Sequence, residues 1–310
     1  MKISVILPVF NEGDNIIPMY HKLKEVIAPS GLEPEFVFIN DGSTDGSYSI
    51  IKNLSLENRN VKFVNFSRNF GHQAALTAGL DYASGDAVIT MDCDFQDPPE
   101  LIPEMIKKWQ EGNEVVYTRR KQRKDGFFKT ITAKLYYKII YWFSEFKIHG
   151  NVGDFRLLGK KALAEINKMR EKSRYLRGMV PWIGFQFAIL DYERPLRIHG
   201  KTGYKFLQMF RLGMNGLLSF SLAPIRFGLI AGFFIIFSGI GFLIYMFFNY
   251  MINDQFYKLL EWMAVVNYIL IGFLLIMIWI IAEYIGKIFN ETKNRPIYII
   301  NDTGNIENIK

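Results

Sequence analysis

Two long stretches without a charged residue place the strongest constraint on how this chain can fold. One lies between Arg226 and Asp254, and the other lies between Glu261 and Glu283. A helix needs about 20 apolar residues to cross a hydrocarbon core of about 30 Å, and each stretch is long enough. A pair of buried core helices is the alternative, but soluble helices of this length usually keep a polar face. The sequence therefore predicts two transmembrane helices within residues 225–286.

The charges around these stretches predict the orientation of the spans. The short segment between them is nearly charge-balanced, with Asp254, Lys258 and Glu261. Basic residues lie on the outer sides of both stretches: Arg194, Arg197, Lys201, Lys205 and Arg211 before the first, and Lys287, Lys293 and Arg295 after the second. An excess of lysine and arginine near the ends of spans marks the cytoplasmic side. We therefore expect a multi-pass protein of the cell membrane, with both termini and the N-terminal domain in the cytoplasm.

Net charge and cysteine content narrow the possible partners. The formal net charge of +7 suits a protein that works beside anionic lipid and handles phosphorylated substrates. Nucleic acid would also be attracted, but no nucleic-acid-binding module is recognisable, so we predict no nucleic-acid partner. Cys93 is the single cysteine, which excludes a disulfide framework and a thiolate metal site.

The N-terminal part of the chain alternates between strand and helix patterns. Strands are predicted over residues 3–8, 35–39, 61–66, 86–91 and 114–118, and helices over 14–28, from 47, over 71–83 and over 98–110. Such alternation indicates an α/β domain over residues 1–200, a mostly parallel sheet with helices on both faces. Ligands of these folds bind outside the carboxyl ends of the strands. Several polar residues should therefore converge on one crevice: Asn11, Glu12, Asp41, Asp92, Asp94 and Arg119.

The most specific chemical signal is the run from Asp92 to Glu100, which follows an apolar strand. Asp92 and Asp94 are two carboxylates one residue apart. Mg²⁺ and Mn²⁺ prefer oxygen ligands and are often bound by one or two carboxylates together with substrate phosphates. A solvated acidic turn is the alternative. Pro98 and Pro99 open a helix directly afterwards, so the turn is held between two regular elements, which favours a metal site.

Residues 126–148 interleave lysines with many aromatic residues. This pattern is typical of a helix that lies in the lipid headgroup region, although an amphipathic helix on the protein's own core would look similar. Residues 201–224 have the same character and lead into the first span, so we predict a second, juxtamembrane interfacial helix there. Residues 287–310 are predicted to form a cytoplasmic tail.

Three motifs together resemble the inverting family-2 glycosyltransferases. They are the opening residues 3–12, the Ile39–Gly46 segment and the Asp92 run, in the order and spacing of that family over residues 1 to about 205. The later Asp154–Leu158 and Arg174–Gly178 segments, with the two spans, are similar to the branch that includes dolichol-phosphate-mannose synthase and bacterial polyprenyl-phosphate glycosyltransferases. The resemblance implies a GT-A-like (Rossmann-like) fold.

It also implies an activity: transfer of a sugar from a nucleotide-diphosphate sugar to polyprenyl (undecaprenyl) phosphate. UDP-sugar is the favoured donor and GDP-mannose the other. The polyprenyl-monophosphate sugar formed would serve cell-envelope glycan or glycoprotein modification.

The resemblance also assigns a donor site. It implies that Pro8, Val9, Phe10, Glu12, Ile39, Asp41, Asp92, Cys93 and Arg119 bind the nucleotide sugar. Asp94 and Gln96 would ligate Mg²⁺ or Mn²⁺, with Asp92 nearer the ribose or bound through water. The ion would stabilise the departing nucleoside diphosphate as a Lewis acid. For Asp41 the alternative is a turn carboxylate that accepts hydrogen bonds from local amides.

The acceptor determines how much acid–base chemistry is needed. A lipid monophosphate has a second pKa near 6 and can attack as a dianion, whereas a hydroxyl needs a general base. A phosphate acceptor favours a cationic cluster, for which the candidates are Lys129, Lys134, Arg174, Arg177, Arg197 and Lys201. Asp154 stands where the family places a catalytic carboxylate, and we expect it to orient groups at the anomeric centre. The alternative is an ion pair with Arg156 or another basic residue.

Two other functions remain open on the sequence. One is transfer to a lipid or glycan hydroxyl, including processive polysaccharide synthesis, although the chain has no Q-x-x-R-W motif and only two spans. The other is a non-catalytic membrane scaffold, against which Asp41, Asp92 and Asp94 argue. The expected partners are the lipid bilayer, a flippase and a second copy of the chain.

Overall fold

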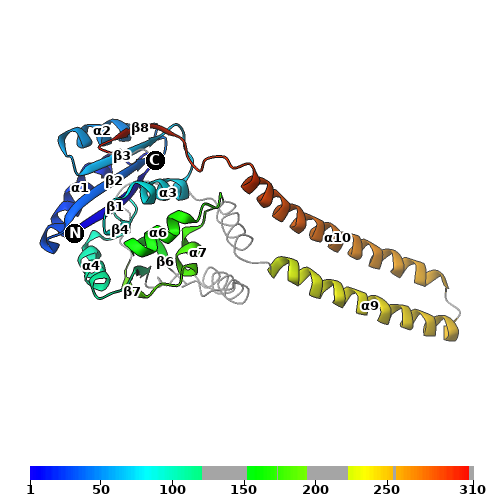
Figure 1. The fold of residues 1–310 in the computed structure, drawn as a ribbon. Coiled ribbons are helices and arrows are strands. Elements are labelled where there is room, and N and C mark those ends of the chain that lie inside the picture. The colour runs from blue at the N-terminus through cyan, green and yellow to red at the C-terminus, as the bar shows by residue number, and fades with distance from the viewer. Residues whose placement is uncertain (121–151, 173, 194–222, 254–255, 307–310) are drawn as a thin grey trace. The chain divides into compact units, whose positions relative to one another are not determined.

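The computed structural model describes residues 1–120, 152–172, 174–193, 223–253 and 256–306 (Figure 1). These residues divide into two compact units. The first contains a large sheet and its helices, and the second contains two long helices. The interfacial helices predicted over residues 126–148 and 201–224 lie outside the described residues, apart from the last two positions of the second.

An eight-stranded mixed sheet forms the centre of the first unit, in the order β7-β5-β6-β4-β1-β2-β3-β8. Its strands are β1 (Lys2–Val9), β2 (Glu33–Asn40), β3 (Val61–Phe66), β4 (Ala87–Thr90), β5 (Val115–Arg120), β6 (Val152–Gly159), β7 (Phe187–Tyr192) and β8 (Ile300–Gly304). Pairs β1–β2, β1–β4, β2–β3 and β5–β7 are parallel, whereas β4–β6, β5–β6 and β3–β8 are antiparallel. The predicted α/β class is confirmed, and β1 to β5 match the five predicted strands.

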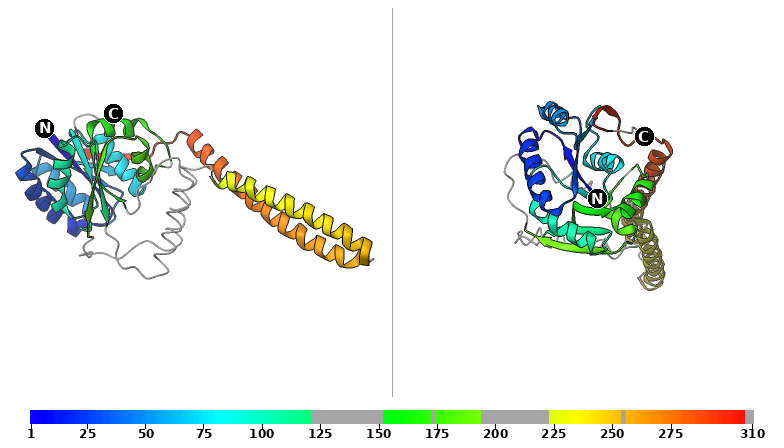
Figure 2. Two further views of the ribbon diagram at one scale, coloured as in Figure 1. Left: turned by 90° about the horizontal axis from the view of Figure 1, so that it is seen from below. Right: turned by 60° about the vertical axis from the view of Figure 1, so that its left-hand side comes forward.

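Helices cover both faces of this sheet (Figure 2). The helical segments are α1 (Gly13–Ile27), η1 (Ala28–Ser30), α2 (Ser47–Glu57), α3 (His72–Tyr82), η2 (Pro99–Leu101), α4 (Ile102–Gln110), α6 (Lys160–Lys168) and α7 (Leu176–Trp182). Helices α1, α2 and α4 bury Ile16, Ile51 and Ile102 in one core. On the other face α3 packs closely on β1, because a Cβ at Gly79 would lie 2.1 Å from Ile6 Cγ2. Strands covered on both sides are almost continuously apolar, which is why β1 to β4 were recognisable.

The C-terminal segment is part of the sheet, which corrects the prediction of a tail over residues 287–310. β8 pairs antiparallel with β3 at the edge of the sheet. Just before it, the Tyr298 hydroxyl donates a 2.8 Å hydrogen bond to Asp81 Oδ2, and its ring stacks on Phe66 at 5.1 Å. Asn305 Nδ2 then donates to the Val61 carbonyl at 2.8 Å. The strands β7 and β8, which precede α9 and follow α10 in the chain, therefore belong to one folded unit.

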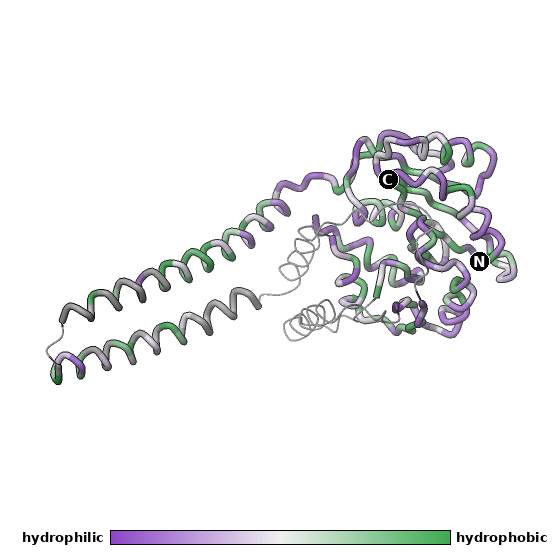
Figure 3. Tube along the Cα trace, turned by 180° about the vertical axis from the view of Figure 1, so that it is seen from behind, coloured by the Kyte–Doolittle hydropathy of each residue, from purple (hydrophilic) through white to green (hydrophobic). Residues whose placement is uncertain are grey.

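The second unit consists of α9 (Ala223–Asn253) and α10 (Phe256–Thr292), which contact each other. Leu270–Thr292 of α10 is long and apolar enough to cross a membrane, and its residues are not buried within the protein. Figure 3 shows the hydrophobic residues along α10. In α9 the apolar segment Ile240–Ile252 is shorter than this criterion requires. Among the described residues one helix thus satisfies the criterion for a span, and the second predicted span stays a prediction.

Candidate active site

The carboxyl ends of the central strands bring the predicted site segments together. Val9 pairs with Asn40 and Ile6 pairs with Thr90, so the loops after β1, β2 and β4 begin at one edge of the sheet. The first two loops are joined by hydrogen bonds: the Asn11 amide donates to Ser43 Oγ at 3.0 Å. The Thr44 amide donates back to Asn11 Oδ1 at 2.8 Å. Polar residues of the loops after β1 and β2 therefore fix these two loops against each other.

Asp41 closes the loop that leads into α3. Its Oδ1 accepts from the Phe70 amide at 2.7 Å and its Oδ2 accepts from the Gly71 amide at 2.9 Å. Burial raises the pKa of Asp41, while these two amides lower it. These contacts match the amide-binding alternative for Asp41, and its contact with a nucleotide stays a prediction.

The remaining nucleotide-site residues differ in accessibility. The side chains of Val9, Ile39 and Cys93 are buried in the core, and burial raises the pKa of the Cys93 thiol. Phe10, just beyond β1, is 47% exposed and can offer its ring to a ligand. Glu12 Oε2 accepts from Asn15 Nδ2 at 2.5 Å at the start of α1. Val9 and Ile39 are 1% and 0% exposed with their main chain included, so they offer almost no surface to a ligand, and their contact with the nucleotide stays a prediction.

The turn after β4 presents the two carboxylates of the motif. The Asp92 side chain is 35% exposed, whereas Asp94 is buried and its Oδ1 accepts from the Gln96 amide at 3.1 Å. Phe95, between Asp94 and Gln96 in the sequence, has a left-handed φ of 58°. This conformation is a clear outlier for a bulky residue. Strained residues of this kind concentrate at functional sites.

The donor set of this turn fits a hard divalent cation. Partial burial raises the pKa of Asp92, His72 lowers it, and the nearby charges of Asp154 and Asp94 raise it further. A cation would relieve that crowding of negative charge. Among the described residues, no group of three or more His, Cys, Asp or Glu side chains is arranged so that it could hold a metal ion. Two carboxylates suffice for Mg²⁺ or Mn²⁺ when substrate phosphates complete the shell.

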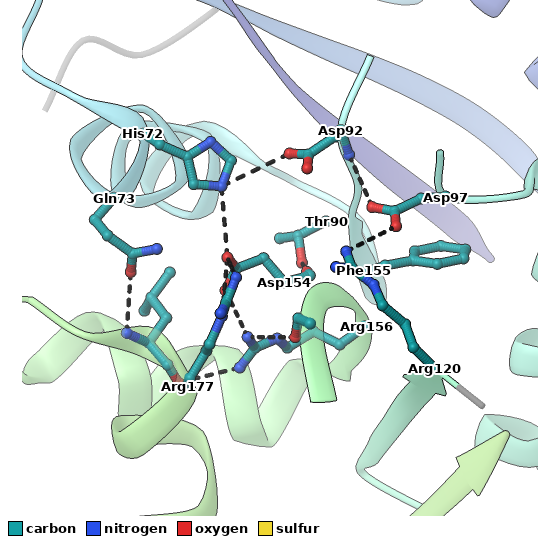
Figure 4. A network of polar contacts seen from close by, with 12 residues as sticks. His72, Gln73, Thr90, Asp92, Asp97, Arg120, Asp154, Phe155, Arg156 and Arg177 are labelled. Atoms are coloured by element: carbon teal, nitrogen blue, oxygen red, sulfur yellow. Dashed lines mark hydrogen bonds and ion pairs between the residues drawn. The ribbon is translucent and has the colours of Figure 1, made fainter. Parts of the chain in front are cut away.

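Behind the turn lies a network that the sequence analysis did not assign (Figure 4). Asp97 is 1% exposed; its Oδ2 accepts from the Asp92 amide at 3.3 Å. Its Oδ1 accepts from the Tyr192 hydroxyl at 3.0 Å and lies 3.6 Å from Arg120 Nη2. Arg120 Nε donates to the same hydroxyl at 2.9 Å. The motif contains Asp97, but its partners on β5 and β7 are distant in the sequence.

Arg120, and not Arg119, reaches the turn of residues 92–97, the candidate metal-binding turn. Arg119 forms a two-pronged ion pair with Asp191 on the neighbouring strand, at 2.6 and 2.9 Å. Both side chains of that pair are exposed to solvent by 40% or more. Successive residues of a strand point to opposite faces, so Arg120 projects towards Asp97. The contacts of Arg119 therefore do not support its predicted role at the diphosphate.

Asp154 of β6 lies in a cluster of cationic side chains. Its Oδ1 accepts from Arg156 Nη2 at 2.8 Å, and its Oδ2 accepts from Arg177 Nη2 at 2.8 Å. Burial would raise the pKa of Asp154, but Arg177, His72 and Arg156 outweigh it and hold the pKa well below its ordinary value. The alternative predicted for Asp154, an ion pair with Arg156 or another basic residue, is confirmed, since Arg156 and Arg177 both pair with it.

His72, the first residue of α3, lies between Asp154 and Asp92 of the candidate metal-binding turn. Its Nε2 lies 3.6 Å from Asp154 Oδ2 and 3.7 Å from Asp92 Oδ1. Burial lowers the pKa of His72, but the contact with Asp154 and the charges of both carboxylates raise it to about 9. The imidazole is therefore positively charged at neutral pH. The sequence analysis did not assign His72 to the site. Its position in the first turn of the helix after β3 was the sequence signal that could have indicated it.

Of the six predicted acceptor-phosphate residues, the structure describes two. Arg177 is 37% exposed and pairs with Asp154. Arg174 is buried instead and donates to the carbonyls of Met169 and Ile166, at 2.7 and 3.0 Å. Arg174 thus caps the end of α6, which corrects its predicted role. Lys129, Lys134, Arg197 and Lys201 lie outside the described residues.

Comparison with known proteins places these features in a family. Residues 4–166 match the family model described as glycosyl transferase family 2. An uncharacterized glycosyltransferase of Bacillus subtilis, YkcC, is 42% identical over 98% of this chain and 95% of its own length.

Two other relatives are similar over nearly their whole length. The SfII prophage-derived bactoprenol glucosyl transferase of Shigella flexneri is 40% identical over 97% of each chain. The uncharacterized glycosyltransferase sll0501 of Synechocystis is 35% identical over 99% of this chain and 97% of its own. The protein is an enzyme, and it belongs to glycosyl transferase family 2.

Proposed function

We propose that this enzyme transfers a sugar, with inversion, from a nucleotide-diphosphate sugar to a polyprenyl phosphate in the membrane. A UDP-sugar is the favoured donor, with GDP-mannose as the other, and undecaprenyl phosphate is the favoured acceptor. The relative from Shigella flexneri is named for glucosyl transfer to bactoprenol, a polyprenol, which supports the acceptor class. The product would be a polyprenyl-monophosphate sugar for cell-envelope glycan or glycoprotein modification.

The environment of Asp154 is the observation that carries this proposal. Its carboxylate accepts hydrogen bonds from Arg156 and Arg177, which keep its pKa well below the ordinary value. Such a group is a poor proton acceptor at neutral pH, so a hydroxyl acceptor would lack a base at this position. A lipid phosphate is already mostly dianionic at that pH and needs none. The site therefore favours a phosphate acceptor.

The cationic side chains beside Asp154 suit the same acceptor. Arg177 is held in place by Asp154 Oδ2, and the charged imidazole of His72 lies 3.6 Å from the same oxygen. Together they offset the negative charge of the metal-binding turn, which would otherwise repel an incoming phosphate. We assign Arg177 to the acceptor phosphate and Asp154 to orienting it.

On the donor side, Asp92, Asp94 and Gln96 would hold a Mg²⁺ or Mn²⁺ ion. When bound, the ion supplies Lewis-acid stabilisation of the departing nucleoside diphosphate. The partly exposed Asp92 presents its carboxylate to the crevice, and the buried Asp94 is oriented by the Gln96 amide. The ring of Phe10 is available to pack against the base or ribose.

The order of the chain through the sheet supports a two-helix anchor. β7 precedes α9 and β8 follows α10, and both strands belong to the same sheet. If α10 crosses the bilayer once, a second crossing must return the chain to that sheet. α9, with 31 residues, is about 45 Å long and can provide it. The basic residues that flank the helices then place the sheet in the cytoplasm.

A transfer assay with two matched lipids tests this proposal. The full-length enzyme in detergent is offered UDP- and GDP-sugars with either undecaprenyl phosphate or undecaprenol, with and without EDTA. We expect transfer to the phosphate alone, with loss of transfer in EDTA. Transfer to undecaprenol, or to a glycan hydroxyl but not to the lipid phosphate, would overturn the proposal.

A further inference from the structure

We propose that Tyr192 and Arg120 are positioning residues for the metal-binding turn, and that they act through Asp97. In this view they hold the Asp92 backbone where its carboxylate can bind a divalent cation together with a nucleoside diphosphate. The inference rests on the proposed function, because it concerns the metal that the donor would require. It adds residues of β5 and β7 to a site otherwise built from the loops after β1, β2 and β4.

A continuous chain of hydrogen bonds carries the inference. Arg120 Nε donates to the Tyr192 hydroxyl at 2.9 Å, and that hydroxyl donates to Asp97 Oδ1 at 3.0 Å. Asp97 Oδ2 accepts from the Asp92 amide at 3.3 Å. Both oxygens of Asp97 are thus engaged with the protein, and the carboxylate binds the backbone of the turn. Figure 4 shows Asp97 between Asp92 and Arg120.

Burial makes each of these hydrogen bonds necessary, because water cannot readily replace a lost partner. Asp97 is 1% exposed and Tyr192 is 5% exposed, so the carboxylate has little access to water as a substitute partner. An unpaired buried polar group is costly, and the three residues are therefore expected to act as a unit. Their target is a turn that contains the left-handed Phe95, a conformation that persists only where its surroundings enforce it.

The network also adjoins the acceptor side of the crevice. A Cβ at Gly153 would lie 3.3 Å from Arg120 Nη2, so a side chain there would crowd the guanidinium. Gly153 directly precedes Asp154 on β6. The Tyr192 ring in turn meets the Phe155 ring edge-on at 6.3 Å. The same two residues thus pack against the strand that carries Asp154 and hydrogen-bond towards the turn that carries Asp92.

Groups that orient metal ligands from outside the coordination shell are typically worth 10–100-fold in metal affinity or activity. A residue that serves only the fold would change stability but not the metal dependence of ligand binding. The two roles are therefore separable by measuring Mn²⁺ directly. Tyr192→Phe is the most informative variant, because it removes one hydroxyl and keeps the ring that packs on Phe155.

The test uses the full-length enzyme in detergent. Free Mn²⁺ is followed by electron paramagnetic resonance as the protein is titrated in the presence of UDP, and in parallel with GDP. We expect Tyr192→Phe to raise the Mn²⁺ dissociation constant roughly 10–100-fold, and Asp97→Asn to raise it at least as much. Tyr20→Phe is the matched control, since Tyr20 is also buried and its hydroxyl also donates to a side-chain oxygen, that of Asn58 at 2.9 Å.

The outcomes separate this inference from the proposed function. Wild-type Mn²⁺ affinity in Tyr192→Phe, with or without a loss of thermal stability, would overturn the positioning role. An equal loss in Tyr20→Phe would also overturn it, because the effect would then not be specific to the network. If Asp97→Asn does not fold, Tyr192→Phe decides the question. Absence of Mn²⁺ uptake by the wild type with either nucleotide would instead contradict the metal-dependent donor site of the proposed function, and this inference with it.

Discussion

Carboxylates at the two ends of the sheet have opposite environments. At the amino end of β2, Glu35 is fully buried, with Lys2 Nζ at 2.5 Å and Lys62 Nζ at 2.8 Å. Ser84 donates to it from both its amide and its hydroxyl, at 2.9 and 2.6 Å. Burial raises the pKa of Glu35, but Lys2, Lys62 and Ser84 outweigh it and lower the pKa to about 2.

At the carboxyl end the acidic groups crowd one another. Burial and the charge of Asp92 raise the pKa of Asp97 to about 6, although Arg120 opposes them. Burial likewise raises the pKa of Asp92, with Asp154 and Asp94 adding to it and His72 opposing it. Negative charge is therefore fully compensated at one end of the sheet and only partly compensated at the other.

The difference separates stability from function. A carboxylate that is paired on all sides can stabilise the fold but has no capacity left for a ligand. Carboxylates that repel one another lower stability and are poised to bind a cation. Variants at the two ends should accordingly show opposite effects on activity and on stability.

The largest effect on activity is expected at the carboxyl end. Asp94→Asn keeps an oxygen to accept from the Gln96 amide but removes the charge that would bind the proposed metal ion. Loss of one charge-stabilising contact typically costs roughly 10²–10³ in rate. We expect a loss of that size in kcat/KM, with an unchanged melting temperature. EDTA should mimic the variant, and added Mn²⁺ should restore the wild type only. Full activity of the wild type in EDTA would refute the role given to this turn.

Removal of α9 and α10, the proposed membrane hairpin, should have a somewhat smaller effect. Because β8 belongs to the sheet, residues 223–294 should be replaced by a flexible linker while residues 295–310 are kept. We expect nucleotide binding to persist and use of undecaprenyl phosphate in liposomes to fall by roughly 10²-fold, since co-localisation with the lipid is lost. A water-soluble short-chain phosphate serves as the control acceptor. Equal use of both acceptors by the full-length and linker forms would show that the hairpin has no part in presenting the lipid.

The amino end should show the converse behaviour, with little change in rate. Glu35→Gln leaves Lys2 and Lys62 without their shared carboxylate, and we expect a loss of about 3 kcal/mol in stability at neutral pH. The folded-state pKa of about 2 lies below the ordinary value of 4.5, so this stabilisation is present above pH 4.5 and lost as the pH falls towards 2. Thermal denaturation from pH 7 to pH 3 measures it.

The difference in melting temperature between wild type and Glu35→Gln should therefore shrink as the pH is lowered through that window. Asp94→Asn is the comparison variant from the carboxyl end of the sheet, and its melting temperature is measured over the same pH range. A large loss of kcat/KM in folded Glu35→Gln would break the proposed division between the two ends of the sheet.

Much of the fold was predictable because β1 to β5 are apolar runs covered on both faces. β6 was missed because its buried residues include Asp154 and Arg156, whose ion pair makes an interior strand look polar in the sequence. β8 was missed because Ile300–Gly304 is short and polar, and its pairing with β3 depends on contacts about 240 residues apart in the chain.

The site was predictable where the signal was local. Asp92 and Asp94 form a compact motif, and the edge at which Asp41 lies follows from the alternation of strands and helices. Whether Arg119 or Arg120 points towards the site depends on which residues of β5 face each side of the sheet. A shift of one residue in the strand reverses the face to which each side chain points. The choice between Arg174 and Arg177 depends on where α6 ends and α7 begins. His72 and Asp97 acquire their roles from partners that are distant in the sequence.

The most direct test of a phosphate acceptor is the pH–rate profile of the wild type and Asp154→Asn under saturating donor, with metal occupancy checked at each pH. The rate should rise as the lipid phosphate ionises near a pKa of about 6 and then level off. Because the arginines hold the pKa of Asp154 well below its ordinary value, neutralising it should lower the plateau without moving the inflection. An inflection that is present in the wild type and absent in Asp154→Asn would show that Asp154 is the general base, and would contradict a phosphate acceptor.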